Sequence, residues 1–240
     1  MKAVILAGGT GTRLLPLTRL MNKHLLPVGK LPMICYSINK LKEAGITEIM
    51  LVTGRHAAGS FIEFLGSGRE YGVSLTYRIQ EEAGGIAQAL ELAQSFVGAD
   101  RKFAVLLGDN LFEEPLNSHL ERFRQQQGGA MVLLKQVPDP HRYGVPVFDS
   151  NGRITRIDEK PVIPRSDRCV TGIYLFDESV FSLIAHQEPS MRGELEITDV
   201  NNTYAAQGML EYGELSGWWT DAGTFESLLE ASVKLMELSP

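Results

Sequence analysis

The chain has 240 residues, of which 44% are hydrophobic and 22% are charged, and its formal net charge is −6. This composition is typical of a globular chain long enough to bury a core, and it argues against a disordered or fibrous protein. The acidic balance leaves no basic footprint for nucleic acid, and the two cysteines, Cys35 and Cys169, are too few for a disulfide framework. No run approaches the ~20 apolar residues of a membrane span, so we expect a cytoplasmic protein without nucleic-acid or membrane partners.

The first half of the chain alternates short apolar runs with helical patterns. Apolar runs bounded by glycine or polar residues predict strands over residues 3–7, 49–53, 75–79 and 103–107. Apolar residues at helical spacing predict helices over residues 33–41, 61–65, 86–97 and 116–123. Strand–helix–strand units of this length give parallel strands with right-handed crossovers, and ligands bind beyond the carboxyl ends of such strands.

The second half is richer in strands. Apolar runs predict strands over residues 130–137, 145–148, 154–158 and 170–176, and Asn151-Gly152 predicts a hairpin turn between two of them. Helical patterns return over residues 180–184, 197–206 and 225–236. Because no Pro/Ser-rich linker, repeat or low-complexity stretch interrupts the pattern, we expect one α/β domain over residues 1–240, with a mostly parallel central sheet and helices on both faces.

A glycine-rich turn, Gly8-Gly9-Thr10-Gly11-Thr12-Arg13, follows the first strand. Glycines admit positive φ and bring backbone N–H groups close to a ligand, and consecutive N–H groups form an anion-binding concavity. The turn does not fit the dinucleotide fingerprint, because Leu14 stands where the third glycine belongs, and no Gly-Lys pair precedes Ser or Thr as in Walker A. Arg13 and Lys23 add cations for phosphate oxygens. The segment predicts a phosphate loop of another kind, with a plain tight turn as the alternative.

Two carboxylates lie where a metal ion could bind. Asp109 follows the strand predicted over residues 103–107, and Asp221 lies in the segment 218–224. Carboxylates and the phosphates of a nucleotide are the usual ligands of Mg²⁺, which keeps several waters. Each Asp taken alone is equally consistent with a turn or a helix cap, and Glu159-Lys160 taken alone is typical of a solvated charge run.

One long ordered pattern carries a family resemblance. It consists of Leu6-Ala7-Gly8-Gly9-Thr10-Gly11-Thr12-Arg13-Leu14, followed by Pro16, Thr18, Lys23 and Leu26-Pro27-Val28. This pattern resembles the signature of the sugar-1-phosphate nucleotidylyltransferases, and the similarity continues to about Leu238. Within that family the chain is most similar to the branch that transfers thymidylyl groups to glucose 1-phosphate.

The resemblance implies a fold, a reaction and a cofactor. The fold is the Rossmann-like nucleotide-diphospho-sugar transferase fold, with a nucleotide-binding part over about residues 1–128 and a sugar-binding part over about residues 129–240. The reaction is dTTP plus glucose 1-phosphate to dTDP-glucose and pyrophosphate, with Mg²⁺ as cofactor, and it feeds nucleotide-sugar biosynthesis of the dTDP-rhamnose type.

The resemblance also implies roles for individual residues. The implied catalytic residues are Arg13, Lys23 and Lys160, and the implied metal ligands are Asp109 and Asp221. The implied nucleotide-binding residues are Leu6, Gly8, Gly9, Gly11, Thr12, Arg13, Gln80, Gly85 and Asp109. The implied sugar-binding residues are Tyr143, Gly144, Glu159, Lys160, Val170, Tyr174 and Trp219.

Departures from the family pattern leave alternatives open. Ala83-Gly84 stands where the thymidylyl branch often has Pro-Asp, and Leu31 stands where Lys usually precedes Pro-Met. Many relatives continue into C-terminal helices that form a regulatory and subunit-contact region, so their feedback control and tetramer are not carried over, and a homo-oligomer is left open. The alternatives to the implied reaction are the same chemistry with UTP or another sugar 1-phosphate, a non-catalytic nucleotide-sugar sensor, and a dinucleotide oxidoreductase.

Overall fold

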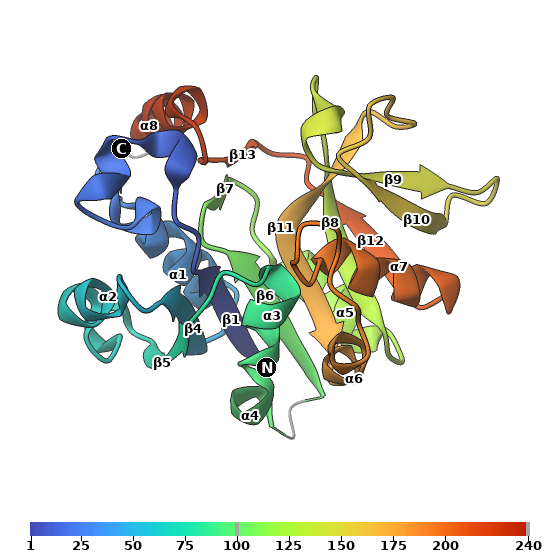
Figure 1. The fold of residues 1–240 in the computed structure, drawn as a ribbon, viewed down its shortest axis with the longest axis horizontal. Coiled ribbons are helices and arrows are strands. Elements are labelled where there is room, and N and C mark those ends of the chain that lie inside the picture. Colours follow the sequence, from blue (N-terminus) through green and yellow to red (C-terminus); the bar gives the residue numbers. More distant parts are fainter. Residues whose placement is uncertain (99–100, 239–240) are drawn as a thin grey trace.

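A seven-stranded sheet forms the centre of the computed structural model, which describes residues 1–98 and 101–238 (Figure 1). The strand order is β12-β8-β11-β6-β1-β4-β5. The strands are β1 (Lys2–Ala7), β4 (Glu48–Gly54), β5 (Ser74–Gln80), β6 (Lys102–Leu107), β8 (Ala130–Gln136), β11 (Arg168–Asp177) and β12 (Leu210–Glu214). Strand β11 runs antiparallel to both of its neighbours, β6 and β8, whereas the other neighbouring pairs are parallel. The predicted mostly parallel sheet is confirmed.

The strand order creates a topological switch point beside β1. The chain passes from β1 outward to β4 and β5, and then returns to place β6 on the other side of β1. The carboxyl ends of β1 and β6 therefore border the crevice where ligands bind in open α/β sheets. Gly8 follows the last residue of β1 and Gly108 follows the last residue of β6. The Gly108 N–H donates to the Leu6 carbonyl at 3.0 Å.

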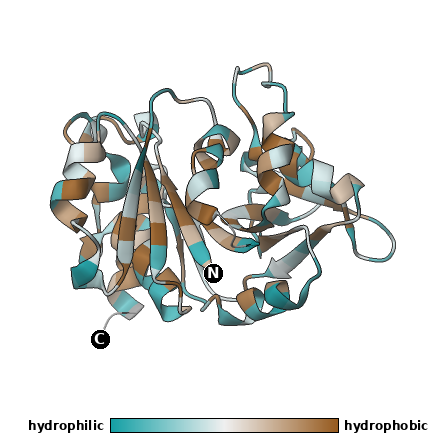
Figure 2. Ribbon diagram, turned by 90° about the horizontal axis from the view of Figure 1, so that it is seen from below, coloured by the Kyte–Doolittle hydropathy of each residue, from teal (hydrophilic) through white to brown (hydrophobic). Residues whose placement is uncertain are grey.

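Helices cover both faces of the sheet. On one face lie α1 (Met33–Glu43), α2 (Ala58–Leu65) and α5 (Asn117–Gln125), and on the other lie α3 (Ile86–Glu91), α4 (Gln94–Val97), α6 (Ser179–Ala185) and α7 (Ile197–Ala206). Strand β1 explains the division, because Ile5 packs into the first buried cluster and Val4 into the second, as alternating side chains must. The hydrophobic colouring of Figure 2 follows the strands and the helix surfaces that contact them.

Short strands and the last helix close the end of the molecule above β1. Strand β7 (Asn110–Phe112) pairs with β13 (Trp219–Asp221), and β2 (Pro27–Val28) pairs with β3 (Leu31–Pro32). Helix α8 (Phe225–Leu238) packs over these pairs in a third buried cluster that contains Val28, Leu111 and Ala231. Figure 1 shows β7 and β13 running between the part with β1, β4 and β5 and the part with β8, β11 and β12.

The predicted hairpin is present as β9 (Gly144–Phe148) and β10 (Ile154–Glu159), which pair antiparallel. The Asp149 carboxylate closes its turn by accepting from the Asn151 N–H at 2.9 Å and the Arg153 N–H at 2.8 Å. Helix α7 fastens the hairpin, because the Asn202 amide bonds to both the N–H and the carbonyl of Ile157.

Two parts of the predicted element order are wrong. The helix predicted over residues 86–97 is divided into α3 and α4, since the Ala93 N–H bonds to the Leu90 carbonyl in a tighter turn that keeps Ala93 and Val97 buried. The strands β2, β3, β7, β12 and β13 were not predicted, because strands this short carry little periodicity. Short 3₁₀ turns occur at Thr12–Leu14, Leu17–Arg19, Lys23–Leu25, Arg69–Tyr71 and Pro140–Arg142.

Within residues 1–98 and 101–238, no helix combines the length and the apolar content that crossing a membrane requires.

Candidate active site

The glycine turn lacks side chains where other groups must approach. A Cβ on Gly8 would lie 2.5 Å from Oε1 of Gln80, so glycine leaves room for that amide over the end of β1. Gly11 has a φ of 66°, and its Cβ would lie 2.8 Å from Cγ2 of Thr18. Gly8 and Gly9 are not in the positive-φ region, so their role is close approach instead of an unusual backbone.

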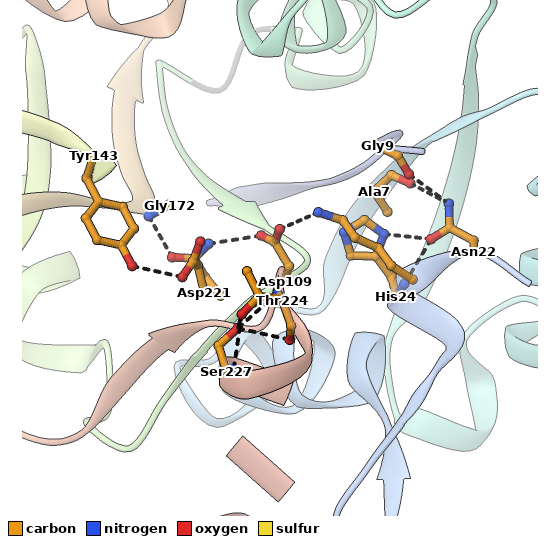
Figure 3. Close-up of polar contacts among 12 residues, drawn as sticks. Ala7, Gly9, Asn22, His24, Asp109, Tyr143, Gly172, Asp221, Thr224 and Ser227 are labelled. Atoms are coloured by element: carbon orange, nitrogen blue, oxygen red, sulfur yellow. Dashed lines mark hydrogen bonds and ion pairs between the residues drawn. The ribbon is translucent and has the colours of Figure 1, made fainter. Parts of the chain in front are cut away.

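Asn22 holds the turn from the opposite side. Its amide nitrogen lies 3.4 Å from the carbonyls of Ala7 and Gly9, and its Oδ1 accepts from the His24 N–H and from His24 Nδ1 (Figure 3). Burial, followed by the charge of Lys23, lowers the pKa of His24 to about 3, so the ring is neutral at physiological pH. Because Nδ1 donates to Asn22, Nε2 is left as a hydrogen-bond acceptor.

Lys23 and Asp109 form an ion pair at the switch point. Nζ of Lys23 lies 2.5 Å from Oδ2 of Asp109, and the amide of Asn110 donates to Oδ1 at 3.1 Å. Burial is the largest single influence and raises the pKa of Asp109, but the adjacent positive charge, chiefly that of Lys23, together with the hydrogen bonds from Lys23 and Asn110 outweighs burial and holds that pKa below its usual range. Asp109 is therefore an ionised carboxylate fixed at both oxygens.

The β7–β13 ladder brings Asp221 beside Asp109. Its register pairs Asp221 with Asn110, and the Ala222 N–H donates to the Asp109 carbonyl at 2.9 Å. Figure 3 shows Asp109 between Asp221 and His24, with the Tyr143 hydroxyl donating to Oδ1 of Asp221 at 2.9 Å. Burial, and then the negative charge of Asp109, raise the pKa of Asp221. Because the charge of Asp109 contributes to the raised pKa of Asp221, a cation between the two carboxylates would be favourable.

The side chain of Arg13, which comes from the glycine turn, extends toward Asp221. A Cβ at Gly223 would lie 2.8 Å from Nη2 of Arg13 and 3.7 Å from Oδ2 of Asp221, so both side chains extend to this glycine. The guanidinium therefore lies near the acidic pair, although the Arg13 side chain remains largely exposed.

A cavity of about 270 Å³ opens on the side of the switch point that faces α3. Its lining includes the predicted residues Leu6, Gly8, Gly9, Lys23, Gln80, Gly85 and Asp109. The Gln80 amide nitrogen donates to Oε1 of Gln88 at 2.8 Å and lies 3.3 Å from the Gly85 carbonyl, which holds this side chain at the rim. We call this space the nucleotide-side cavity.

A second cavity of about 210 Å³ lies between β11, the β9–β10 hairpin and α7. Its lining includes the predicted residues Arg13, Tyr143, Gly144, Glu159, Lys160, Val170, Tyr174, Trp219, Asp109 and Asp221. Glu159 accepts from the Thr198 hydroxyl at 2.7 Å and lies 3.3 Å from Nζ of Lys160. Lys160 has a φ of 46°, a region that non-glycine residues rarely occupy, and its N–H donates to the Tyr143 carbonyl. We call this space the sugar-side cavity.

The two cavities share a wall, because Ile86, Leu107, Asp109 and Glu196 line both. Most predicted site residues thus meet in one continuous cleft. Gly11 and Thr12 line neither cavity and lie in the glycine turn that supports the cleft. Arg13, predicted for the nucleotide, lines the sugar-side cavity beside Asp221.

Several polar residues of the cleft were not predicted from the sequence. They are His24, Asn110, Glu194, Glu196, Thr198 and Asn201. Asn22, which holds the glycine turn from outside the two cavities, was not predicted either. Asn110 was visible as the neighbour of Asp109, and its Oδ1 joins three elements by accepting from the Gly172 N–H at 2.7 Å and the Trp219 indole at 2.8 Å. The roles of the others depend on elements that are distant in the sequence.

Comparison with known proteins gives a consistent result. The family model described as nucleotidyl transferase matches residues 2–237. A glucose-1-phosphate thymidylyltransferase of Neisseria meningitidis is 43% identical over 97% of this chain and 81% of its own length, and one of Mycobacterium tuberculosis is equally similar.

Solved structures agree with these relatives. A crystal structure of a proposed glucose-1-phosphate thymidylyltransferase from Bacillus anthracis, in complex with a sucrose, is 53% identical with a TM-score of 0.94 and covers 99% of this chain and 96% of that chain. A UDP-glucose pyrophosphorylase complexed with UDP-glucose is 26% identical with a TM-score of 0.87, covering 99% and 98%. The resemblance seen in the sequence is confirmed, and the chain belongs to the nucleotidyl transferase family.

Proposed function

We propose that this chain transfers the thymidylyl group of dTTP to glucose 1-phosphate, forming dTDP-glucose and pyrophosphate. One observation carries the proposal: Asp109, an ionised carboxylate paired with Lys23, lies on the wall shared by the nucleotide-side and sugar-side cavities. A group that is transferred between two bound substrates must react at the place where their two sites meet. The names of the relatives, glucose-1-phosphate thymidylyltransferase, support the choice of substrates.

The nucleotide-side cavity suits a pyrimidine nucleotide. The Gln80 amide nitrogen at its rim is held by Gln88 and the Gly85 carbonyl, which leaves Oε1 of Gln80 to accept from the imide N–H of thymine. Gly8 and Gly9 bring bare backbone to the ligand, so the base and ribose meet no Cβ there. In this proposal residues 1–128 supply most of the nucleotide site, joined by Glu194 and Glu196 from the second half of the chain.

The sugar-side cavity suits a hexose phosphate. Glu159 accepts hydrogen bonds from hydroxyls, as it does from Thr198, and Lys160 supplies a cation for the phosphate. Tyr143 and Trp219 pack edge to face with ring centroids 5.5 Å apart, which gives the sugar an apolar wall. In this proposal residues 129–240 supply most of the sugar site.

The acidic pair fits Mg²⁺. Asp109 and Asp221 offer hard oxygen ligands, and a bound cation would offset the charge of Asp109 that, after burial, raises the pKa of Asp221. Among the described residues, no three His, Cys, Asp or Glu side chains are placed to hold one metal ion together, so the remaining positions of the ion would belong to water and phosphate oxygens. When bound, the ion would polarise the α-phosphate and neutralise charge.

The chain's own groups then position and neutralise the reactants. A phosphate oxygen of the sugar phosphate attacks the α-phosphorus, a new P–O bond forms, and the bond to the β-phosphate breaks so that pyrophosphate leaves with the electron pair. Lys160 holds the attacking phosphate, while Lys23 and Arg13 offset the charge of the triphosphate. Such a transfer depends on orientation and charge more than on proton transfer.

The test is a pyrophosphate-release assay with dTTP, glucose 1-phosphate and Mg²⁺, followed by a panel of nucleotides and sugar phosphates. We expect the highest kcat/KM for dTTP with glucose 1-phosphate, and loss of turnover on chelation. A preference for UTP would move the chain toward the UDP-glucose pyrophosphorylase it resembles in fold. Tight binding of dTDP-glucose without pyrophosphate release would favour a sensor and contradict the proposal.

A further inference from the structure

Asn201 presents an unpaired amide to the sugar-side cavity. The residue lies on α7, is 1% exposed, and belongs to the lining of that cavity. Its Oδ1 is buried and has no hydrogen-bond partner among the described residues. Burying an unpaired amide oxygen is unfavourable, because the group loses water and gains nothing in return. A native structure keeps such a group where a ligand or an ordered water pairs it.

The neighbouring polar groups of α7 show what a structural role looks like. Asn202 spends both ends of its amide on β10, accepting from the Ile157 N–H at 2.6 Å and donating to the Ile157 carbonyl at 3.0 Å. Thr198, one turn before Asn201, donates to Glu159 at 2.7 Å. Asn201 lies between these two on the same helix and its oxygen bonds to neither, so it is not needed to fasten α7 to the hairpin.

The chemistry of the unpaired atom limits its ligand. An amide oxygen accepts a hydrogen bond, so the ligand group must donate one, which a fully ionised phosphate cannot do. A sugar hydroxyl both donates and accepts, so it pairs with either end of the amide. The phosphate of the substrate already has Lys160 at the same cavity.

We propose that Asn201 recognises a hydroxyl group of the hexose and contributes to the choice of sugar. This inference rests on the proposed function, since it assigns a sugar phosphate to the cavity. Glu159, held by Thr198, and Asn201, three residues further along α7, then form two adjacent recognition points for the sugar ring. Asn201 is a binding residue in this role and takes no part in the transfer of the phosphoryl group.

The experiment compares Asn201→Leu with the matched variant Asn202→Leu. Pyrophosphate release is measured at saturating dTTP with glucose 1-phosphate and with its 2-, 3-, 4- and 6-deoxy analogues. We expect Asn201→Leu to lower kcat/KM for glucose 1-phosphate about tenfold, as for loss of one buried hydrogen bond. For the analogue that lacks the contacted hydroxyl, wild type and variant are expected to be equal within about twofold, because the interaction is already absent.

Asn202→Leu is expected to lower Tm and to affect all five sugars equally, since its bonds hold β10. Asn201→Leu is expected to leave Tm without ligand unchanged or higher, because it removes a buried unpaired polar group. A loss in Asn201→Leu that is equal for every analogue, or no loss at all, would overturn the inference, since a buried water or a structural role would explain either result.

A binding measurement separates this inference from the proposed reaction. Glucose 1-phosphate is added alone, and the shift in Tm is recorded for wild type and Asn201→Leu. If wild type releases no pyrophosphate with any nucleotide, the proposed reaction fails, while a Tm shift in wild type that Asn201→Leu reduces still supports the sugar contact. If wild type shows neither turnover nor a Tm shift, both proposals are contradicted.

Discussion

The two halves of the cleft are built by different means. The nucleotide-side cavity is built around bare backbone at the carboxyl end of a parallel strand, at Gly8 and Gly9 after β1, with the side chains of Lys23 and Gln80 beside it. The sugar-side cavity is made mainly of side chains from β10, β11, β13 and α7, together with Tyr143 just before β9, and these elements are spread over the second half of the sequence. Asp109 borders both.

The two cavities keep their shapes through different interactions. A backbone site keeps its form because strand pairing fixes it, as in the β1–β4 and β1–β6 registers. A side-chain site depends on hydrogen bonds such as those of Glu159 with Thr198 and of Asp221 with Tyr143. Single substitutions are therefore expected to act selectively on one substrate, except where the halves meet.

The largest effect is expected at the shared wall. Asp221→Asn keeps the shape and the acceptor for Tyr143 but removes the charge beside Asp109, so kcat/KM should fall on the order of a thousandfold for both substrates. Pyrophosphate release with either substrate varied measures this. The control is Asp199→Asn, an exposed carboxylate of α7 that lines neither cavity. Near-native turnover in Asp221→Asn would contradict a role of the acidic pair in the transfer reaction.

The next largest effect is expected on the sugar side alone. Lys160→Met removes the cation paired with Glu159, so the KM for glucose 1-phosphate should rise between about tenfold and a hundredfold while the KM for dTTP stays unchanged. Steady-state kinetics with each substrate varied in turn measures the split. Lys234→Met is the control, since Lys234 pairs with Glu237 on α8. An equal rise in both KM values would mean that the halves are not independent.

A smaller effect is expected on the nucleotide side. Gly8→Ala places a Cβ 2.5 Å from Oε1 of Gln80 and must displace that amide, so the KM for dTTP should rise about tenfold while the KM for glucose 1-phosphate stays constant. Gly59→Ala is the matched control, because a Cβ there meets nothing within 4 Å. Unchanged nucleotide KM in Gly8→Ala would show that Gln80 does not contact the base.

The smallest effect concerns stability instead of activity. The pKa of His24 is lowered from 6.5 to about 3, so the unfolded chain binds a proton that the folded chain does not as pH falls below about 6.5. The neutral ring makes its full contribution to the free energy of unfolding above pH 6.5, and this contribution is lost as the pH falls toward 3. His24→Gln should therefore flatten the pH dependence by at most about 1.4 kcal/mol per pH unit.

Denaturant unfolding of wild type and His24→Gln between pH 7 and pH 4 checks this expectation. His56→Gln, which changes an exposed histidine, should leave the profile of the wild type in place. Parallel pH profiles for wild type and His24→Gln would mean that the ring is not buried in its neutral form.

The nucleotide half was largely visible in the sequence. The predicted strand over residues 3–7, the glycine turn after it and Asp109 after residues 103–107 all lie at one edge of the sheet, as parallel strands require. The prediction worked because each feature is local: a strand, the residue that follows it, and the rule for where strand ends meet.

The sugar half was visible only through the family resemblance. Glu159-Lys160 taken alone has the pattern of a solvated charge run, and only the pairing of β9 with β10 and the contact with α7 bring Glu159 to Thr198. No local sequence feature distinguishes Asn201 from Asn202. In the described residues the Oδ1 of Asn201 has no hydrogen-bond partner, whereas the Oδ1 of Asn202 accepts from the Ile157 N–H.

The sequence by itself determined an α/β chain of strands and helices, a glycine turn after the first strand, and a set of cations and carboxylates. Hydrophobic periodicity and glycine conformational freedom act over a few residues, so these features can be read without the fold. Only the tertiary structure decided that Asp221 lies beside Asp109, through the short β7–β13 ladder between segments more than one hundred residues apart. Strand pairing at that separation depends on the packing of the whole domain, because a three-residue strand carries no signal of its own partner.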